Sequence, residues 1–395
     1  MPTTIHLIAP HHTVLNDEHS HCAFTGKARR FAKMMHLVGR GVFGGPFVHK
    51  YNIIEYANEG SMSEADEKVV MLNAAEYKKF YKHETNSPGA QSNVDLPGAQ
   101  LFRQRLEAAL ADRAKVGDIC GHIWAAHSPM VQRFPGLIHI ETGIGYPQGS
   151  FGAYRIFESE AWRHYQWGRI GSHGGVMPGC EVHPQGIDTN TARTWVVPNY
   201  FDLDDWPVVS ERPAAESDYV VFMSRFVVDK GIVMLARVIK AWCKKHPESV
   251  LRFKLAGMGG YAQWLVDSDF TPAELGRIDY VGVVNGRDRA KLIGGARAML
   301  LPTIFVEPFG GAAVEAMLCG TPAITSDFGA FTETVWPETG FRCRTVDDYV
   351  AAIEGAAHMH RGEVAELTRN RYSLEACAEK YDKIFEELVT HPYAS

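Results

Sequence analysis

Residues 297–326 read "RAMLLPTIFVEPFGGAAVEAMLCGTPAITS" and contain a strand, a turn, a helix and a second strand in direct succession. The run "RAMLLPT" is apolar and has the length of a buried strand, "GAAVEAMLCG" is a helical run that ends at Gly320, and "PAITS" is the next strand. Two strands joined by a helix predict a parallel βαβ unit. We therefore expect an α/β fold in which helices cover both faces of a parallel sheet.

The same alternation extends through the rest of the chain. Strands are predicted at 218–224, 251–257 and 278–284, and a helix with basic residues in its last turn at 231–246. In the first half, apolar runs predict strands at 3–10, 52–57, 117–126 and 136–143. The segment 23–40 is predicted as a helix, because Phe31, Met34, Met35 and Val38 form one apolar face.

Two polar segments and one connection divide this pattern. Residues 59–100 predict a loop excursion, and residues 168–187 a glycine-rich loop. The proline-marked stretch 194–209 predicts a hinge. We expect two doubly wound, Rossmann-like parallel-sheet domains that face a central cleft. The first covers residues 1–198 and the second 199–373, and a closing helix at about 374–395 returns to the first domain.

Composition excludes several classes of protein. No stretch reaches the roughly 18 apolar residues of a membrane helix, and the first residues predict a strand instead of a signal peptide. The seven scattered cysteines contain no C-x-x-C and fit reduced thiols. A net charge of −6 argues against bulk affinity for nucleic acid. We expect a cytoplasmic protein without a transmembrane segment.

The candidate site lies in loops that follow strands of the second half. Glu307 and Glu315 stand on either side of the turn Gly310-Gly311, which opens a helix. The amides of such a helix start suit a phosphate, and carboxylates suit the paired hydroxyls of a sugar or a ribose. Arg225 and Lys230 follow the strand 218–224 and could neutralise a diphosphate. We found no D-x-D pair in a strand-end loop, so we expect a site without a metal.

Residues 218–340 resemble the donor half of glycosyltransferase family 4, whose members are retaining enzymes of the GT-B fold that use nucleotide sugars. The stretches "SRFVVDKGI" and "EPFGGAAVEAMLCGTPAITSDFGAFTETV" carry the resemblance. It implies that Arg225, Lys230 and Glu307 act in catalysis and that Glu315 binds the nucleotide ribose. It also implies donor contacts from the backbone of Phe309, Gly310, Gly311 and Ala312, and nucleobase contacts near Val283 and Val284.

The first half resembles the family in layout, and its acceptor-side residues are less defined. Thr25-Gly26-Lys27 stand where the family often has a Gly-Gly turn. Many members carry a histidine at the end of the strand that corresponds to 136–143, where this chain has Glu141. His139, His122 and His127 are the alternatives for that histidine.

Other polar groups have a plain and a functional interpretation. His11, His12, His19 and His21 are either a chance cluster or an acceptor-binding loop. One face of the predicted helix 23–40 is basic, and this pattern favours a face exposed to solvent. The alternative is a surface that binds an anionic acceptor. The basic residues are Arg29, Lys33, His36 and Arg40. The spacing of His173, Cys180 and His183 fits no zinc pattern, and "AGMGGY" at 256–261 predicts a tight turn more than a phosphate cradle.

The sequence thus predicts a metal-independent, retaining glycosyltransferase with no cofactor besides its co-substrate, a nucleotide-diphosphate sugar. The acceptor is a hydroxyl group of a glycan, a lipid or a small molecule. Three alternatives stay open: the same chemistry on a hydroxylated base in DNA, a nucleotide-sugar epimerase, and a non-catalytic binder of sugar nucleotides.

Overall fold

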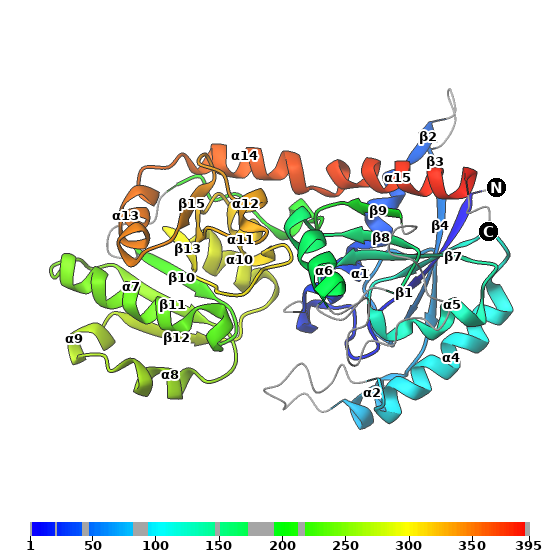
Figure 1. Cartoon of the computed structure of the whole chain (residues 1–395), viewed down its shortest axis with the longest axis horizontal. Coiled ribbons are helices and arrows are strands. Elements are labelled where there is room, and N and C mark those ends of the chain that lie inside the picture. Colours follow the sequence, from blue (N-terminus) through cyan, green and yellow to red (C-terminus); the bar gives the residue numbers. More distant parts are fainter. Residues whose placement is uncertain are drawn as a thin grey trace. The chain divides into compact units, whose positions relative to one another are not determined.

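The computed structural model describes residues 2–19, 22–41, 47–81, 94–146, 151–172, 193–211 and 218–391. The chain forms two compact units. Unit 1 contains residues Met1–Phe201 and Tyr372–Ser395, and unit 2 contains Asp202–Arg371. Each unit is built on one parallel sheet with helices on both faces (Figure 1). The predicted α/β class with two doubly wound sheets is therefore confirmed.

Unit 1 has a seven-stranded sheet in the order β5-β4-β1-β6-β7-β8-β9, in which every neighbouring pair is parallel. The strand order reverses between β1 and β6: β4 and β5, which follow β1 in the chain, lie on one side of this point, and β7, β8 and β9, which follow β6, lie on the other. The strands are β1 (Thr3–Ile8), β4 (Tyr51–Ala57), β5 (Glu67–Val70), β6 (Ile119–His122), β7 (Ile138–Ile144), β8 (Tyr154–Phe157) and β9 (Arg193–Val196), and β2 (Gly39–Gly41) with β3 (Phe47–His49) forms a separate antiparallel pair.

Two apolar layers cover the faces of this sheet. One layer packs Ile5 and Leu7 of β1 against α1 and α15, so the closing helix belongs to unit 1, as predicted. The other layer packs Ile8 and Tyr56 against α2, α4 and α5. The helices are α1 (Ala23–His36), α2 (Ala74–Phe80), α4 (Pro97–Arg113), α5 (Pro129–Arg133), α6 (Glu160–Ser172) and α15 (Leu374–Thr390), with short 3-10 turns η1 (Asp17–His19) and η2 (Ala125–His127).

Unit 2 has a six-stranded parallel sheet in the order β12-β11-β10-β13-β14-β15. The helices α7 and α13 cover one face, and α11 contacts β13 and β14. The strands are β10 (Tyr219–Met223), β11 (Arg252–Ala256), β12 (Ile278–Gly282), β13 (Ala298–Leu301), β14 (Ala323–Ser326) and β15 (Gly340–Cys343). The helices are α7 (Ile232–Lys245), α8 (Tyr261–Ser268), α9 (Pro272–Leu275), α10 (Gly286–Gly294), α11 (Gly311–Leu318), α12 (Phe331–Thr334), α13 (Val346–Ala356) and α14 (Arg361–Tyr372), with 3-10 turns η3 (Leu203–Asp205) and η5 (Val228–Lys230).

One loop prediction was wrong, and a second was wrong over its first five residues. The segment 59–100 contains β5, α2 and the start of α4, and its residues 82–93 lie outside the described part. The helix α2 begins with a capping box, because Asn73 and Glu76 each accept from the other's backbone amide. The predicted loop 168–187 begins inside α6, which continues to Ser172 around the buried Trp162. His21, His173, Cys180 and His183 lie outside the described residues.

The backbone passes between the two units twice, and both passages meet at one place in unit 1. The amide of Phe201 donates to the carbonyl of Tyr372 at 2.8 Å. Phe201 also pairs with Ser373 in an isolated parallel bridge. No helix in the described segments is long and apolar enough to span a lipid bilayer.

Candidate active site in unit 2

The strand order of unit 2 reverses between β10 and β13. The connections that follow two such strands run to opposite sides of the sheet and leave a crevice at the carboxyl ends of the strands. Ligands of doubly wound domains bind in this crevice. The loop after β10 contains Arg225 and Lys230, and the loop after β13 contains Glu307. The topology therefore brings together three residues that the sequence assigned to catalysis.

Backbone contacts hold these two loops against each other. The carbonyl of Asp229 accepts from the Thr303 hydroxyl at 2.8 Å and from the amides of Ile304 and Phe305 at 3.0 Å each. Gly231 has a φ of 77°, and a β-carbon there would overlap the carbonyl oxygen of Pro302. The glycine permits the close approach, and the hydrogen bonds fix it.

Lys230 and Glu307 form an ion pair across the two loops. The Nζ atom donates to Glu307 Oε1 and lies 4.9 Å from the centroid of the Phe305 ring. Both side chains keep about one sixth of their surface exposed, 15% and 16% respectively. The pair is therefore held in place and is still reachable from solvent. Arg225 is exposed, and its guanidinium makes no hydrogen bond or ion pair with the described residues.

The start of α11 carries the predicted donor-binding backbone. Gly310 has a φ of 80°, and a β-carbon there would overlap the Phe331 ring. The carbonyl of Gly310 accepts from Ala313 and Val314, whereas the amides of Gly311 and Ala312 have no acceptor among the described residues. No atom lies within 4 Å of a β-carbon built on Gly311. Two amides at this helix start are therefore without an acceptor among the described residues, which suits an anion.

Glu315 of α11 is paired with a residue that the sequence analysis missed. Arg289 of α10 donates from Nε at 2.8 Å and also from Nη2, both to Oε2 of Glu315. Each side chain is 15% exposed. Sequence could not show this contact, because the two residues belong to different helices and only packing of α10 against α11 brings them together.

The other predicted donor residues also lie at this edge of the sheet. Val283 and Val284 follow β12, and Val283 is 47% exposed. The Phe309 side chain is buried, which leaves only its backbone for a ligand. Gly257 of "AGMGGY" has a φ of 140°, and a β-carbon there would overlap the carbonyl oxygen of Ser224. The geometry of this glycine therefore fits the tight turn that the sequence favoured.

Three predicted acceptor-side residues are held by interactions within unit 1. Lys27 is buried, forms an ion pair with Glu158 and donates to the Gly143 carbonyl at 2.6 Å. The Thr25 hydroxyl donates to Thr13 at 2.8 Å. Arg30 donates to the Gly26 carbonyl at 2.9 Å. These contacts fix the start of α1.

Glu141 is buried and organises the loop that follows β7. It accepts from the amides of Phe151 and Gly152 at 2.9 and 2.8 Å and from the Tyr146 hydroxyl. Burial raises the pKa of its carboxyl, and the charge of Arg155 and these hydrogen bonds oppose that shift. A histidine in this place could not accept three such bonds.

His11 and His127, two of the histidines that the sequence analysis named, are buried. His11 and His127 lie with their ring centroids 5.9 Å apart, and His127 stacks on Phe102. Burial, with the nearby His127 and His12, lowers the pKa of His11 to about 2. Burial and the charge of Arg103 lower the pKa of His127 to about 3. These rings are therefore neutral at physiological pH.

His122 is fully buried at the end of β6 and shares a hydrogen bond with His139 of β7. The structure thus joins two of the histidines that the sequence offered as alternatives. On the basic face of α1, Arg29 pairs with Asp17 and His36 with Asp66.

Comparisons with known proteins place the chain near glycosyltransferases in sequence and in fold. Residues 217–358 match the model of a family described as glycosyl transferases group 1. The chain is 30% identical over 165 residues to glycogen synthase of Mycobacterium tuberculosis, which is 41% of this chain and 39% of that protein. It is 26% identical over 228 residues to D-inositol 3-phosphate glycosyltransferase of Corynebacterium jeikeium, 52% of this chain and 54% of that protein. The chain thus spans about half or less of the length of these relatives.

Solved structures match over nearly the full chain. AviGT4, a glycosyltransferase involved in avilamycin A biosynthesis, has a TM-score of 0.65 at 16% identity, with 98% of each chain covered. HepE of Anabaena, in complex with UDP and glucose, has a TM-score of 0.60 at 13% identity, with 97% of this chain and 99% of that chain covered. At such identities the likeness concerns the fold, and it agrees with the predicted GT-B fold.

Proposed function

We propose that this chain transfers a sugar, with retention, from a nucleotide-diphosphate donor to a hydroxyl group, because its residues 217–358 match the family of glycosyl transferases group 1. Unit 2 binds the donor, and unit 1 recognises the acceptor. One observation carries the proposal: the Lys230–Glu307 pair lies in the loops at the strand-order reversal of unit 2, and its Glu307 belongs to the loop that leads into the open start of α11.

Each group has a separate task in the proposed reaction. Glu307 accepts hydrogen bonds from the sugar hydroxyls, and Lys230 turns from Glu307 to the diphosphate. Arg225 and the amides of Gly311 and Ala312 stabilise the charge that grows on the diphosphate as the bond between the sugar and the phosphate oxygen breaks. The acceptor oxygen forms the new bond to the same carbon, and its proton passes to the departing diphosphate. Glu315 binds the ribose.

The test measures nucleoside diphosphate release from labelled nucleotide sugars, with uridine donors first because UDP is bound in solved structures of similar fold. Release that requires an added acceptor supports transfer. An epimerised sugar without an acceptor, or binding without turnover, would replace the proposal with one of its alternatives. Salt-sensitive transfer to DNA that is lost when the charges of Arg29 and Lys33 are reversed would assign a base as the acceptor.

Two substitutions test the residues themselves. We expect Lys230→Ala and Glu307→Ala each to abolish transfer while thermal unfolding stays within a few degrees of the wild type. Arg252→Ala is the matched control, because it removes the Arg252–Asp279 ion pair, which joins the amino-terminal part of β11 to β12 in the same unit. Near-normal turnover in both site variants would remove the assignment.

A further inference from the structure

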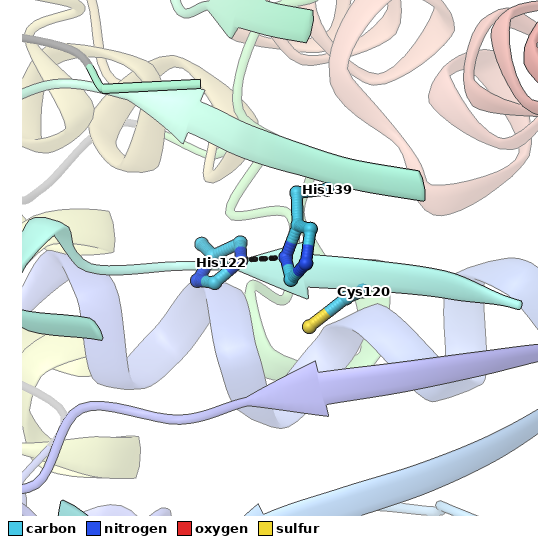
Figure 2. A group of neighbouring side chains, drawn as sticks. All are labelled: Cys120, His122 and His139. Carbon is cyan, nitrogen blue, oxygen red and sulfur yellow. Dashed lines mark hydrogen bonds between the residues drawn. The ribbon is translucent and has the colours of Figure 1, made fainter. Parts of the chain in front are cut away.

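A group of three nitrogen and sulfur donors lies inside unit 1, and the proposed reaction uses none of these residues. Cys120 and His122 belong to β6, and His139 belongs to β7 (Figure 2). Cys120 and His139 are register partners, and His122 lies two residues after Cys120. All three side chains therefore point to the same face of the sheet. One ligand atom from each residue lies within 4.8 Å of the others.

The surroundings of this cluster are dry. Cys120 and His122 have no exposed surface, and His139 keeps 7%. Cys120 belongs to the apolar layer that contains Tyr56, Met130 and Leu137. The Phe151 ring lies edge-on to His122, with centroids 5.1 Å apart. Polar groups in such a layer are costly unless each has a partner.

The hydrogen bonds determine which ring nitrogens carry lone pairs. His139 Nε2 lies 2.9 Å from the carbonyl of Phe134, which can only accept, so this nitrogen carries the proton. His139 Nδ1 is then an acceptor, and His122 Nε2 donates to it at 2.9 Å. His122 Nδ1 is left buried, with no partner in the described segments. The two neutral, hydrogen-bonded imidazole rings therefore leave the lone pair of His122 Nδ1 without a donor in the described part of the chain.

We propose that Cys120, His122 and His139 bind one thiophilic transition-metal ion of the Zn²⁺ class in place of the proton between the two rings. A thiolate and two imidazoles are ligands that such ions prefer. His139 binds through Nδ1, and its Nε2 proton stays on the Phe134 carbonyl, an outer contact typical of metal-bound histidines. The site stabilises the paired ends of β6 and β7.

Protons and charge balance in this step. His122 moves its proton from Nε2 to the unused Nδ1 and binds the ion through Nε2. Cys120 loses its thiol proton to solvent, so one proton is released for each divalent ion and the site gains one positive charge. Glu141, the register partner of His122, lies on the same face of the sheet and shares its charge between this site and Arg155, whose Nε atom lies 4.0 Å from Oε2.

The two imidazole nitrogens must move apart slightly to bind one zinc ion. Two imidazole nitrogens on a tetrahedral zinc ion are about 3.3 Å apart, given zinc–nitrogen bonds of about 2.0 to 2.1 Å. The present separation is 2.9 Å, so the rings must move apart by about 0.4 Å. Three protein ligands leave one tetrahedral position, which is filled by a solvent molecule that enters the buried site together with the ion. This proposal concerns unit 1 and does not depend on the transferase assignment.

The experiment uses the full chain after dialysis against a chelator, titrated with Co²⁺ and observed in the near-ultraviolet. We expect a thiolate-to-cobalt charge-transfer band that saturates at one ion per chain and is displaced by Zn²⁺. Cys120→Ser should abolish the band, and His139→Gln should weaken binding about tenfold or more. Cys377→Ser is the control, because Cys377 is also a buried free cysteine of unit 1 and belongs to α15.

Several outcomes decide the matter. A band that persists in Cys120→Ser, or cobalt uptake without a thiolate band, would overturn the site. Thermal unfolding of each variant without metal shows whether it is folded, and His122→Gln serves as a second ligand variant if His139→Gln does not fold. Displacement of Co²⁺ by Cu⁺ but not by Zn²⁺ would support the site and assign it to copper. Metal content equal in wild type and Cys120→Ser would also refute it.

Discussion

At the scale of single residues, four charged side chains of the candidate site are held in two ion pairs. Lys230 holds Glu307, and Arg289 holds Glu315 through one carboxylate oxygen only. The second oxygen of Glu315 stays available for a hydroxyl group. Pairing of this kind sets the orientation of a side chain in advance, so less freedom is lost when a ligand arrives.

Arg289→Ala tests this orientation of Glu315. The change removes a two-point hydrogen bond to a charged group, of the kind worth about 1.5–3 kcal/mol. We expect the KM for the nucleotide sugar to rise about tenfold or more, with a smaller change in kcat. Initial rates against donor concentration measure both constants. Arg287→Ala is the control, since Arg287 is exposed on the same helix. An unchanged KM in Arg289→Ala would refute the role.

At the scale of elements, five strands of unit 2 and the helices α7, α10 and α11 were predictable, because each is a short uninterrupted run of one periodicity. The strand and helix of 297–326 match β13, α11 and β14. The same reasoning missed β5 and α2. The β5 strand is exposed at the sheet edge, so it carries no apolar run, and α2 shows itself only by its capping box.

The site was predictable to a different degree. Loops after parallel strands share one edge of the sheet, so sequence could place Lys230 near Glu307. It could not show that Arg289 reaches Glu315, because that contact depends on how two helices pack. Nor could it distinguish Lys27 as a ligand group from Lys27 as the buried partner of Glu158, which lies 131 residues away.

The first turn of α11 allows a matched pair of substitutions. Gly310→Ala should destabilise unit 2 by about 1–2 kcal/mol or more, because its positive φ disfavours a side chain and the methyl group would overlap Phe331. Gly311→Ala should leave stability unchanged or raise it by up to about 1 kcal/mol, because its β-carbon meets no atom within 4 Å.

Donor binding in the Gly311→Ala variant should be weakened although its stability is not. If the diphosphate lies on the amides of Gly311 and Ala312, the methyl group of Gly311→Ala occupies the space of the ligand and weakens donor binding. Thermal unfolding and donor titration are measured on both proteins. Full donor affinity in a stable Gly311→Ala protein would contradict the placement of the diphosphate.

At the scale of the whole molecule, burial in unit 1 links stability to pH. His11 is neutral when folded, with its pKa lowered to about 2 by burial, and it binds a proton near its ordinary pKa of about 6.5 when unfolded. The unfolded state thus binds more protons below that value, so stability falls as the pH decreases. At pH 5.5 the loss from this residue is about 1.4 kcal/mol.

His11→Phe should remove this contribution and keep the ring contacts with His127 and Phe102. Urea unfolding at pH 7.5 and 5.5 gives the difference for each protein. We expect the acid loss of the variant to be smaller than that of the wild type by about 1.4 kcal/mol. Equal losses in the two proteins would mean that His11 is protonated in the folded state.

The closing helix is the other determinant of stability in unit 1. Phe385 of α15 is fully buried against the rings of Phe31, Tyr51 and Tyr381. Phe385→Ala should lower the free energy of unfolding of this unit by about 3–5 kcal/mol, while exposed Lys383→Ala on the same helix should change it little. Denaturant unfolding measures both, and equal effects would contradict the packing.

Unit 2 is an insertion in the chain of unit 1, and the hydrogen bond between Phe201 and Tyr372 joins the two residues of unit 1 that flank it. The entry and exit of a 170-residue insertion, Asp202 to Arg371, lie beside each other. A chain in which residue 201 is joined directly to residue 372 would therefore keep the backbone of unit 1 unstretched. The separate segment 202–371 would have its two ends close together. On the proposed assignment, donor binding and acceptor recognition therefore belong to two segments that can be produced and exchanged separately.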